Sequence, residues 1–328
     1  MFRRSEKGED KLAAVSLKPA KVDSDCILKV EGLEKTYRGR RVVAGVSFHV
    51  NKGEIVGLLG ANGAGKTTSF RMTCGMIEPD KGKGKVLLGG LDVTNWPMYR
   101  RAKEGGMGYL AQESSVFRKL TVEQNLLGVM ELLEMPRAQR IALCKDLLEQ
   151  FKISHLRKSR AAALSGGERR RLEIARCLVS DPKIILLDEP FTGIDPVTIQ
   201  SIQAIIRDLK ARGISILITD HQVRETLQIT DRSYVVKSGV VLCHGSPAEV
   251  VSHPEARASY FGSSMDFHAP FPSTPSPGSS PSSAPATTAP AAKPVAAGTP
   301  VAIPAPHKKP RAPASALFEK RPNRWLED

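Results

Sequence analysis

The most constraining feature of the sequence is a glycine-rich segment, Gly60 to Thr67, that fits the pattern G-x-x-x-x-G-K-[ST]. Glycine has no Cβ, so a loop of this kind can bring its backbone N–H groups close to a phosphate group. The pattern carries this meaning only between a strand and a helix. The apolar run Glu54 to Leu59 predicts a buried strand, and Thr68 to Met72 can begin a helix. We therefore expect a phosphate-binding loop rather than an unrelated glycine-rich turn.

Two side chains of this segment suit nucleotide chemistry. We expect Lys66 to reach the β- and γ-phosphates of ATP, and the Thr67 hydroxyl to ligate Mg²⁺. The helix that follows would add the positive end of its dipole to the phosphate site. The predicted ATP-binding residues of this segment are Gly60, Ala61, Asn62, Gly63, Ala64, Gly65, Lys66, Thr67 and Thr68.

A second stretch, Lys183 to Glu189, places two carboxylates at the end of an apolar run. Four consecutive aliphatic residues predict a central parallel strand that is buried on both faces. Ligands bind at the carboxyl ends of such strands, so we expect Asp188 to hold Mg²⁺ and Glu189 to act on the attacking water. The alternative is that Asp-Glu-Pro begins a helix as its N-terminal cap.

A third motif, Leu164 to Glu168, precedes a segment with helical periodicity. Ser-Gly-Gly at the start of a helix predicts a second anion site, yet one nucleotide does not need two such sites from one chain. With these three motifs the sequence resembles the ATP-binding cassette (ABC) ATPases. The resemblance implies an α/β P-loop NTPase fold of ABC type with an inserted helical subdomain, and a homodimer that encloses two ATP molecules. The residues that would bind the ATP of the other subunit are Ser165, Gly166 and Gly167.

The same resemblance implies roles for single residues elsewhere in the chain. Gln112 matches the family's glutamine that links Mg²⁺ and water to the partner contact, although Ala111 stands where proline is commoner. His221 follows an apolar strand pattern and matches the histidine that contacts the γ-phosphate. Tyr37 matches the aromatic residue that stacks on adenine; the alternative is simple packing. The implied catalytic residues are Glu189, His221 and Gln112, and the implied metal ligands are Thr67, Gln112 and Asp188.

Composition and periodicity divide the chain into parts. Residues 1–23 are polar and predict a flexible extension, whereas residues 24–267 are expected to form the ABC ATPase domain. Thr121 to Gln124 is a capping box before a helical pattern, which places the helical subdomain at about residues 113–163. Residues 268–328 contain fourteen of the 23 prolines, so we expect a disordered tail that cannot bury enough apolar surface to offset its ordering entropy.

Charge, cysteine usage and hydropathy limit the functional classes. The net charge of +14 is compatible with contact to nucleic acid or an anionic membrane, but a solvated basic surface is the simpler explanation, and no nucleic-acid partner is expected. The five cysteines form no C-x-x-C pair, which indicates a reducing cytosol. No apolar run approaches the ~18–20 residues of a membrane span, and the N-terminus lacks the apolar stretch of a signal peptide. We expect a protein that does not cross the membrane by itself.

A narrower resemblance is to the ATPase subunits of lipopolysaccharide exporters, over about residues 27–267. The stretches that carry it are Tyr37 to Val43, Gly108 to Arg118, Leu187 to Pro196 and Ile218 to Thr226. It implies two transmembrane subunits as partners, with lipopolysaccharide as the indirect cargo. It also implies a peripheral location on the cytoplasmic face of the inner membrane.

In such a complex, Phe117 and Arg118 would lie in the groove that receives a helix of the transmembrane partner. The alternative is that Phe117 is buried within the helical subdomain. Two other functions stay open from the sequence. One is the ATPase of a branched-chain amino-acid importer, which shares these motifs, and the other is a soluble ABC protein that acts on nucleic acid or ribosomes.

Overall fold

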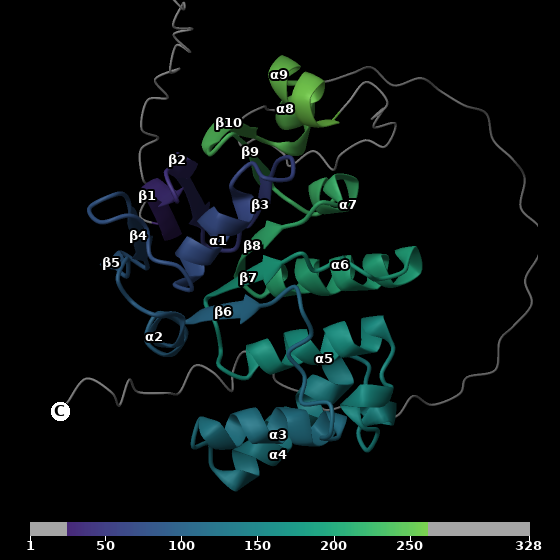
Figure 1. The fold of residues 1–328 in the computed structure, drawn as a ribbon. Coiled ribbons are helices and arrows are strands. Elements are labelled where there is room, and N and C mark those ends of the chain that lie inside the picture. The colour runs from purple at the N-terminus through teal and green to yellow at the C-terminus, as the bar shows by residue number, and fades with distance from the viewer. Residues whose placement is uncertain (1–24, 262–328) are drawn as a thin grey trace, which may run out of the picture. The chain divides into compact units, whose positions relative to one another are not determined.

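Two β-sheets organise residues 25–261, the part of the chain that this computed structural model describes. Helices pack against the larger sheet, and a separate pair of helices lies beyond them (Figure 1). The predicted extension at residues 1–23 and the predicted tail at residues 268–328 lie outside the described residues. The domain boundaries therefore stay predictions.

The larger sheet has six strands in the order β10-β9-β3-β8-β7-β6. In that order the strands span Val240–Gly245, Arg232–Lys237, Ile55–Leu59, Ser215–Thr219, Ile184–Asp188 and Met107–Leu110. Every residue of β3, β7 and β8 is buried, as the continuous aliphatic runs of these central strands predict. The pairs β9–β3, β3–β8, β8–β7 and β7–β6 are all parallel. The carboxyl ends of five strands therefore meet at one edge of the sheet.

The smaller sheet is antiparallel, with the order β2-β1-β4-β5. Every second residue is buried from Val46 to Val50 in β2 and from Leu28 to Val30 in β1, as in a sheet with one covered face. That face packs against Phe70 and Met72 of α1, which is why the two sheets share one core. The strands in sheet order span Arg40–Asn51, Cys26–Tyr37, Lys85–Leu88 and Leu91–Asp92.

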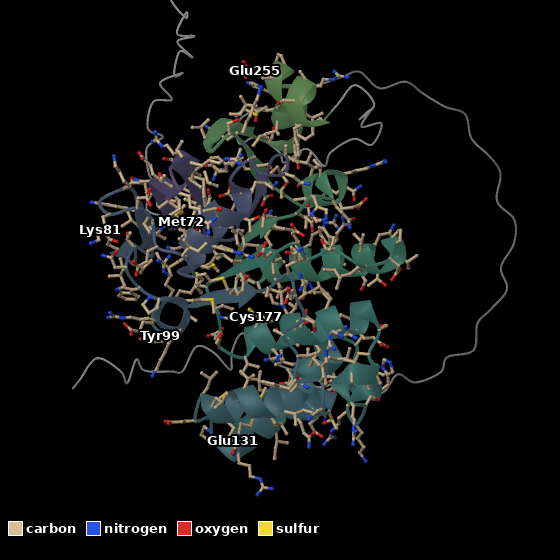
Figure 2. The ribbon with its side chains drawn as sticks, in the orientation of Figure 1. Met72, Lys81, Tyr99, Glu131, Cys177 and Glu255 are labelled. Atoms are coloured by element: carbon tan, nitrogen blue, oxygen red, sulfur yellow. The ribbon has the colours of Figure 1, made fainter. Side chains whose placement is uncertain are left out.

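Three helices carry or position the motifs described above. Helix α1 (Lys66–Cys74) follows β3, α5 (Gly166–Leu178) precedes β7, and α6 (Pro196–Ala211) lies between β7 and β8. Helix α5 packs directly on β6. A Cβ at Gly108 of β6 would lie only 2.5 Å from the Sγ of Cys177 on α5 (Figure 2). The shorter helices are α2 (Met98–Lys103), α7 (Val223–Leu227), α8 (Pro247–Ser252), α9 (Pro254–Ala256) and a π-helical turn (Arg257–Phe261).

The inserted helical segment contains α3 (Val122–Leu132) and α4 (Arg137–Gln150), followed by two short 3₁₀ turns. Thr121 caps α3 as predicted: its Oγ1 accepts a hydrogen bond from the Gln124 backbone, and the Gln124 side chain accepts one from the Thr121 backbone. Both helices lie on the side of α5 that faces away from the larger sheet (Figure 1). The 3₁₀ turns span Ser154–Leu156 and Ala161–Ala163.

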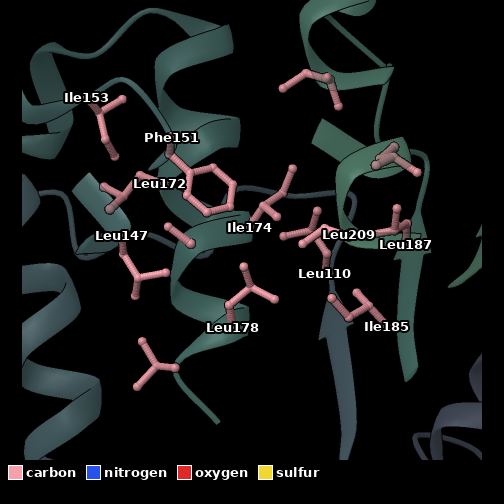
Figure 3. Packing of buried hydrophobic residues seen from close by; sticks show 14 of the residues in the cluster. Leu110, Leu147, Phe151, Ile153, Leu172, Ile174, Leu178, Ile185, Leu187 and Leu209 are labelled. Atoms are coloured by element: carbon pink, nitrogen blue, oxygen red, sulfur yellow. The ribbon is translucent and has the colours of Figure 1, made fainter. Parts of the chain in front are cut away.

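An apolar cluster joins this helical segment to the core. Leu147 and Phe151 from the end of α4 pack with Leu172 and Leu178 of α5, whose other side faces the larger sheet (Figure 3). Phe151 is only 1% exposed. Helix α5 is therefore packed between the helical segment and the larger sheet.

Two further expectations can be compared with the elements that the structure shows. The run Lys183 to Glu189 contains strand β7, and the next helix begins only at Pro196, so the strand prediction is confirmed and the helix-cap alternative is wrong. None of the helices within residues 25–261 is long and apolar enough to cross a membrane.

The packing of Phe151 gives a stability prediction. We expect Phe151→Ala to lower the free energy of unfolding by about 3–5 kcal/mol, because it removes a buried ring and leaves a cavity beside α5. Urea denaturation followed by circular dichroism measures this loss. The matched control is Leu132→Ala at the end of α3, where the side chain is 79% exposed and the loss should be small. Equal losses in both variants would contradict the assigned core.

Candidate active site

The loops that follow four parallel strands meet at the same edge of the larger sheet. The glycine-rich loop follows β3, Gln112 follows β6, Glu189 follows β7 and His221 follows β8. Ligands bind at such an edge in open α/β sheets. The sheet topology therefore brings together residues that are far apart in the sequence.

The glycine-rich loop has a backbone that only glycine can adopt at two of its positions. Gly60 has a φ of 146°, and a Cβ there would lie 2.2 Å from the carbonyl oxygen of Val236. Gly65 has a φ of 100°, and its Cβ would lie 2.7 Å from the carbonyl oxygen of Val42. The loop thus packs tightly between β2 and β9, which fixes its path into α1.

Lys66, the first residue of α1, folds back into this loop. Its Nζ donates hydrogen bonds to the carbonyl oxygens of Gly60 at 2.5 Å and Ala61 at 2.9 Å, and the residue is only 8% exposed. Burial lowers the pKa of the lysine, and the nearby carboxylate of Glu189 opposes that shift. A cation is therefore fixed inside the loop, next to exposed Thr67.

Asp188 ends β7 as a buried carboxylate, 2% exposed. It accepts a hydrogen bond of 3.3 Å from the Tyr109 hydroxyl and forms no salt bridge with any described residue. Burial raises its pKa, and the neighbouring charge of Glu189 raises it further. A cation bound nearby would stabilise the ionised form of this carboxylate. Sequence reasoning assigned no role to Tyr109, because only the parallel pairing of β6 with β7 brings it beside Asp188.

Glu189 lies at the centre of a small polar cluster. Its Oε2 accepts hydrogen bonds from Gln112 Nε2 at 2.6 Å and Thr192 Oγ1 at 3.2 Å. Its Oε1 is 3.2 Å from His221 Nδ1, and His221 Nε2 is 3.4 Å from the Thr192 hydroxyl. Two of the predicted catalytic residues, Gln112 and His221, therefore contact the third, Glu189, and Thr192 joins them. Glu189 also has a φ of 46°, which turns it out of the strand direction.

Arg170 on α5 is another residue that sequence reasoning missed. It is buried, and its guanidinium donates to the carbonyl oxygens of Ala111 at 2.8 Å and of Asp188, Glu189 and Pro190 at 3.3 Å each. Arg170 thereby holds the backbone before Gln112 and the backbone around Glu189 to one helix. The only sequence signal was an arginine within an amphipathic pattern, which ordinarily indicates a solvated face.

The Ser-Gly-Gly motif lies at the N-terminus of α5. Ser165 caps this helix in a capping box with Glu168, and Ser165 and Gly166 are exposed. Hydrogen bonds from Ser165 lower the pKa of Glu168. Gly167 is buried, and a Cβ there would lie 2.2 Å from Thr198 Cγ2 on α6. The recorded hydrogen bonds of Ser165 stay within its own cap, so its assignment to a second nucleotide stays a prediction.

A cavity of about 510 Å³ opens beside the glycine-rich loop. Residues 40–42, 61–64 and 235–238 line it together with Ser259 and Tyr260. The cavity lies on the β9 side of the loop, whereas Glu189 lies on the β7 side. The cavity is therefore separate from the polar cluster around Glu189. Tyr37 is 43% exposed and is not among the lining residues, although Arg40 and Arg41 just after it are. Its stacking on adenine stays a prediction.

Phe117 and Arg118 are both exposed, Phe117 by 47%. The alternative that Phe117 is buried in the helical segment is therefore wrong. Its ring lies under the guanidinium of Arg176, whose central carbon is 4.7 Å from the ring centroid. The groove role of the two residues stays a prediction.

Comparisons with known proteins agree with this geometry. The family described as ABC transporter matches residues 43–192. The chain is 49% identical over 237 residues to the lipopolysaccharide export system ATP-binding protein LptB of Haemophilus influenzae, covering 72% of this chain and 97% of that protein. It is 52% identical over 260 residues to an uncharacterized ABC transporter ATP-binding protein of Rhizobium meliloti, covering 79% of this chain and 95% of the relative.

A solved structure of an ATP-binding cassette of an ABC transporter, in its ADP conformation, superposes with a TM-score of 0.64 at 29% identity. The superposition covers 72% of this chain and 99% of that one. The fold, and not only the motifs, is therefore shared along the described part of the chain. The chain belongs to the ATP-binding proteins of ABC transporters, which are ATPases.

Proposed function

We propose that this protein is the ATP-hydrolysing subunit of a transporter that extracts lipopolysaccharide from the inner membrane toward the outer membrane. The observation that carries this proposal is its 47–50% identity to LptB proteins over 97% of their length. The polar cluster around Glu189 supports the ATPase activity itself. The proposed location is the cytoplasmic face of the inner membrane, where a transmembrane pair would hold the protein.

The residues at the site fit MgATP. Thr67, Gln112 and Asp188 would hold Mg²⁺, which supplies charge neutralisation at the β- and γ-phosphates. The described residues contain no group of three or more His, Cys, Asp or Glu that could hold a metal ion by themselves. Mg²⁺ does not need one here, because it is usually bound through one or two carboxylates together with substrate phosphates. Asp188, buried and without a salt bridge among the described residues, suits that role.

Glu189 would orient the attacking water and accept its proton. Gln112, Thr192 and His221 hold its two oxygens from different sides, so the carboxylate cannot rotate freely. His221, which is exposed, would turn its ring toward the γ-phosphate when ATP is bound. Lys66 and the loop amides would bind the phosphates on the other side of the reacting bond.

A homodimer would complete each site. Ser165 and Gly166 are exposed at the N-terminus of the thirteen-residue helix α5, where free backbone N–H groups favour an anion. We propose that Ser165, Gly166 and Gly167 bind the γ-phosphate held by the other subunit. Two exposed residues, Phe117 and Arg118, would then dock a helix of each transmembrane subunit.

The carboxylate of Asp188 gives a pH prediction. Its pKa is raised in the folded protein, so ionisation destabilises the fold, and stability falls as pH rises through the window between the unfolded and folded pKa values. We expect Asp188→Asn to raise the melting temperature of the nucleotide-free protein at about pH 7–8. The gain should vanish once the pH is low enough to protonate the aspartate. Thermal melts across a pH series measure it, and a gain that persists at the acid end would contradict this origin.

The shared-site arrangement gives a second prediction. We expect Ser165→Arg to lower ATP hydrolysis by roughly 10²–10³-fold, the usual effect of losing one donor to a reacting group, while each monomer still binds ATP. Lys66→Ala should instead lose ATP affinity, because the removed cation lies within the phosphate loop. A fluorescent nucleotide measures binding, and a coupled assay over a dilution series measures hydrolysis. Full activity of dilute monomers would contradict a shared site.

The function is tested with Glu189→Gln protein purified by affinity from detergent-solubilised native membranes in the presence of ATP. We expect hydrolysis to fall by about 10²–10⁴-fold, because a general base is lost, and the ATP-bound dimer to be retained with its partners. Two transmembrane subunits with large periplasmic domains should co-purify. The matched control is Glu131→Gln on α3, an exposed carboxylate far from the site (Figure 2).

Other outcomes of this purification would overturn the proposal. Permeases of many helices with little periplasmic mass would indicate an importer, such as one for branched-chain amino acids. Ribosomal or DNA-associated proteins alone would indicate a soluble ABC protein. Nucleic-acid binding would also show a steep dependence on salt concentration.

A further inference from the structure

We infer that Arg176 on α5 is a positioning residue, which holds Phe117 in the orientation that the transmembrane partner recognises and joins that docking point to the catalytic carboxylate. The inference rests on the proposed function, because it concerns the same docking residues. It goes beyond that function because it assigns the connection between the docking point and Glu189 to helix α5, and not to the loop of Gln112 alone.

The backbone of Phe117 is fixed before any partner binds. Its N–H donates to Asn125 Oδ1 at 2.9 Å, and its carbonyl oxygen accepts from Asn125 Nδ2 at 3.1 Å. Asn125 is fully buried in α3 and also donates to the carbonyl oxygen of Thr121 at 2.9 Å. A half-exposed aromatic ring on a rigid backbone is unusual for a solvated loop, and it is the arrangement of a pre-organised contact residue.

Arg176 fixes the ring itself. Its guanidinium stacks on the Phe117 ring, and its Nη1 donates to the carbonyl oxygen of Ser115 at 2.6 Å. Burial lowers the pKa of this arginine, and its Nε is buried with no hydrogen-bond partner. The planar guanidinium can stack and donate at the same time, which the compact ammonium of a lysine cannot do in one position.

A polar ladder continues from Arg176 along one face of α5. Ser115 N–H donates to Glu173 Oε1 at 3.1 Å, and Glu173 Oε2 forms a buried salt bridge of 3.0 Å with Arg170 Nη1. Arg170 in turn donates to the carbonyl oxygen of Glu189. The three α5 residues are spaced by three positions, so they lie on neighbouring turns of one helix face.

The ladder has a direct consequence for a docking event. A partner helix that moves the Phe117 ring must also move Arg176, because the ring and the guanidinium are in contact. Arg176 and Arg170 lie on the same helix, α5, and Ser165 caps the N-terminus of that helix. Docking would therefore shift the nucleotide-binding end of α5 and the backbone at Glu189 together. The interaction free energy from a double-mutant cycle measures this coupling.

The test is a double-mutant cycle on the dissociation constant of the full-length protein for the detergent-solubilised transmembrane pair recovered with Glu189→Gln protein. We expect Arg176→Lys to weaken binding by about three- to tenfold, since it keeps the charge and removes the stacking. Phe117→Leu should weaken binding as well. The double variant should bind no more weakly than Phe117→Leu alone, because Arg176 acts through the ring.

The matched control is Arg171→Lys on the same helix. Arg171 also has a buried Nε without a hydrogen-bond partner, and its Nη2 donates to Ser201 Oγ on α6 at 2.7 Å, away from Phe117. This variant should bind like the wild type. The melting temperature of each free variant reports folding, and Arg176→Gln replaces Arg176→Lys if the latter is unfolded.

Two results would overturn the inference while the proposed function stands. One is wild-type affinity in Arg176→Lys and Arg176→Gln when Phe117→Leu is impaired. The other is an additive loss in the double variant, which would show that the two side chains act independently. Failure of the wild-type protein to bind any transmembrane pair would instead overturn the proposed function, and the inference with it.

Discussion

The position of Glu189 depends on the register of three parallel strands. Leu187 of β7 pairs with Leu110 of β6 on one side and with Ile218 of β8 on the other. Two residues beyond Leu110 the chain reaches Gln112, and three beyond Ile218 it reaches His221. A slip of one residue would turn each buried side chain to the other face of the sheet, so the apolar cores on both faces hold this register.

Arg170 makes this edge of the sheet continuous with α5. Its charge is buried, and burial of an ion is costly unless hydrogen bonds and a counter-charge surround it. Glu173 and four backbone carbonyl oxygens provide that surrounding, at 2.8–3.3 Å. Because these acceptors belong to the ends of β6 and β7, the arginine can keep its partners only when both strand ends are in place. Helix and catalytic loop therefore form one unit.

The sequence alone predicted features whose signals are local. The glycine-rich loop, the strand before Asp188 and the capping box at Thr121 each depend on residues within a few positions of one another. The contacts of Arg170 and Tyr109 could not be predicted in this way, because their partners lie up to 79 residues away and only the tertiary fold selects them. The order of the motifs predicted the fold class. It did not predict the contacts that connect exposed Phe117 through α5 to Glu189.

The backbone conformation of Glu189 places a free-energy cost at the catalytic carboxylate. A residue with a side chain in the left-handed region costs about 1–2 kcal/mol relative to the right-handed region, and Glu189 has a φ of 46°. Glycine would relieve most of that strain but would remove the carboxylate. The protein therefore keeps a residue with a side chain in a backbone conformation that favours glycine. At this residue the backbone preference for glycine and the need for a carboxylate conflict, and the protein retains the carboxylate.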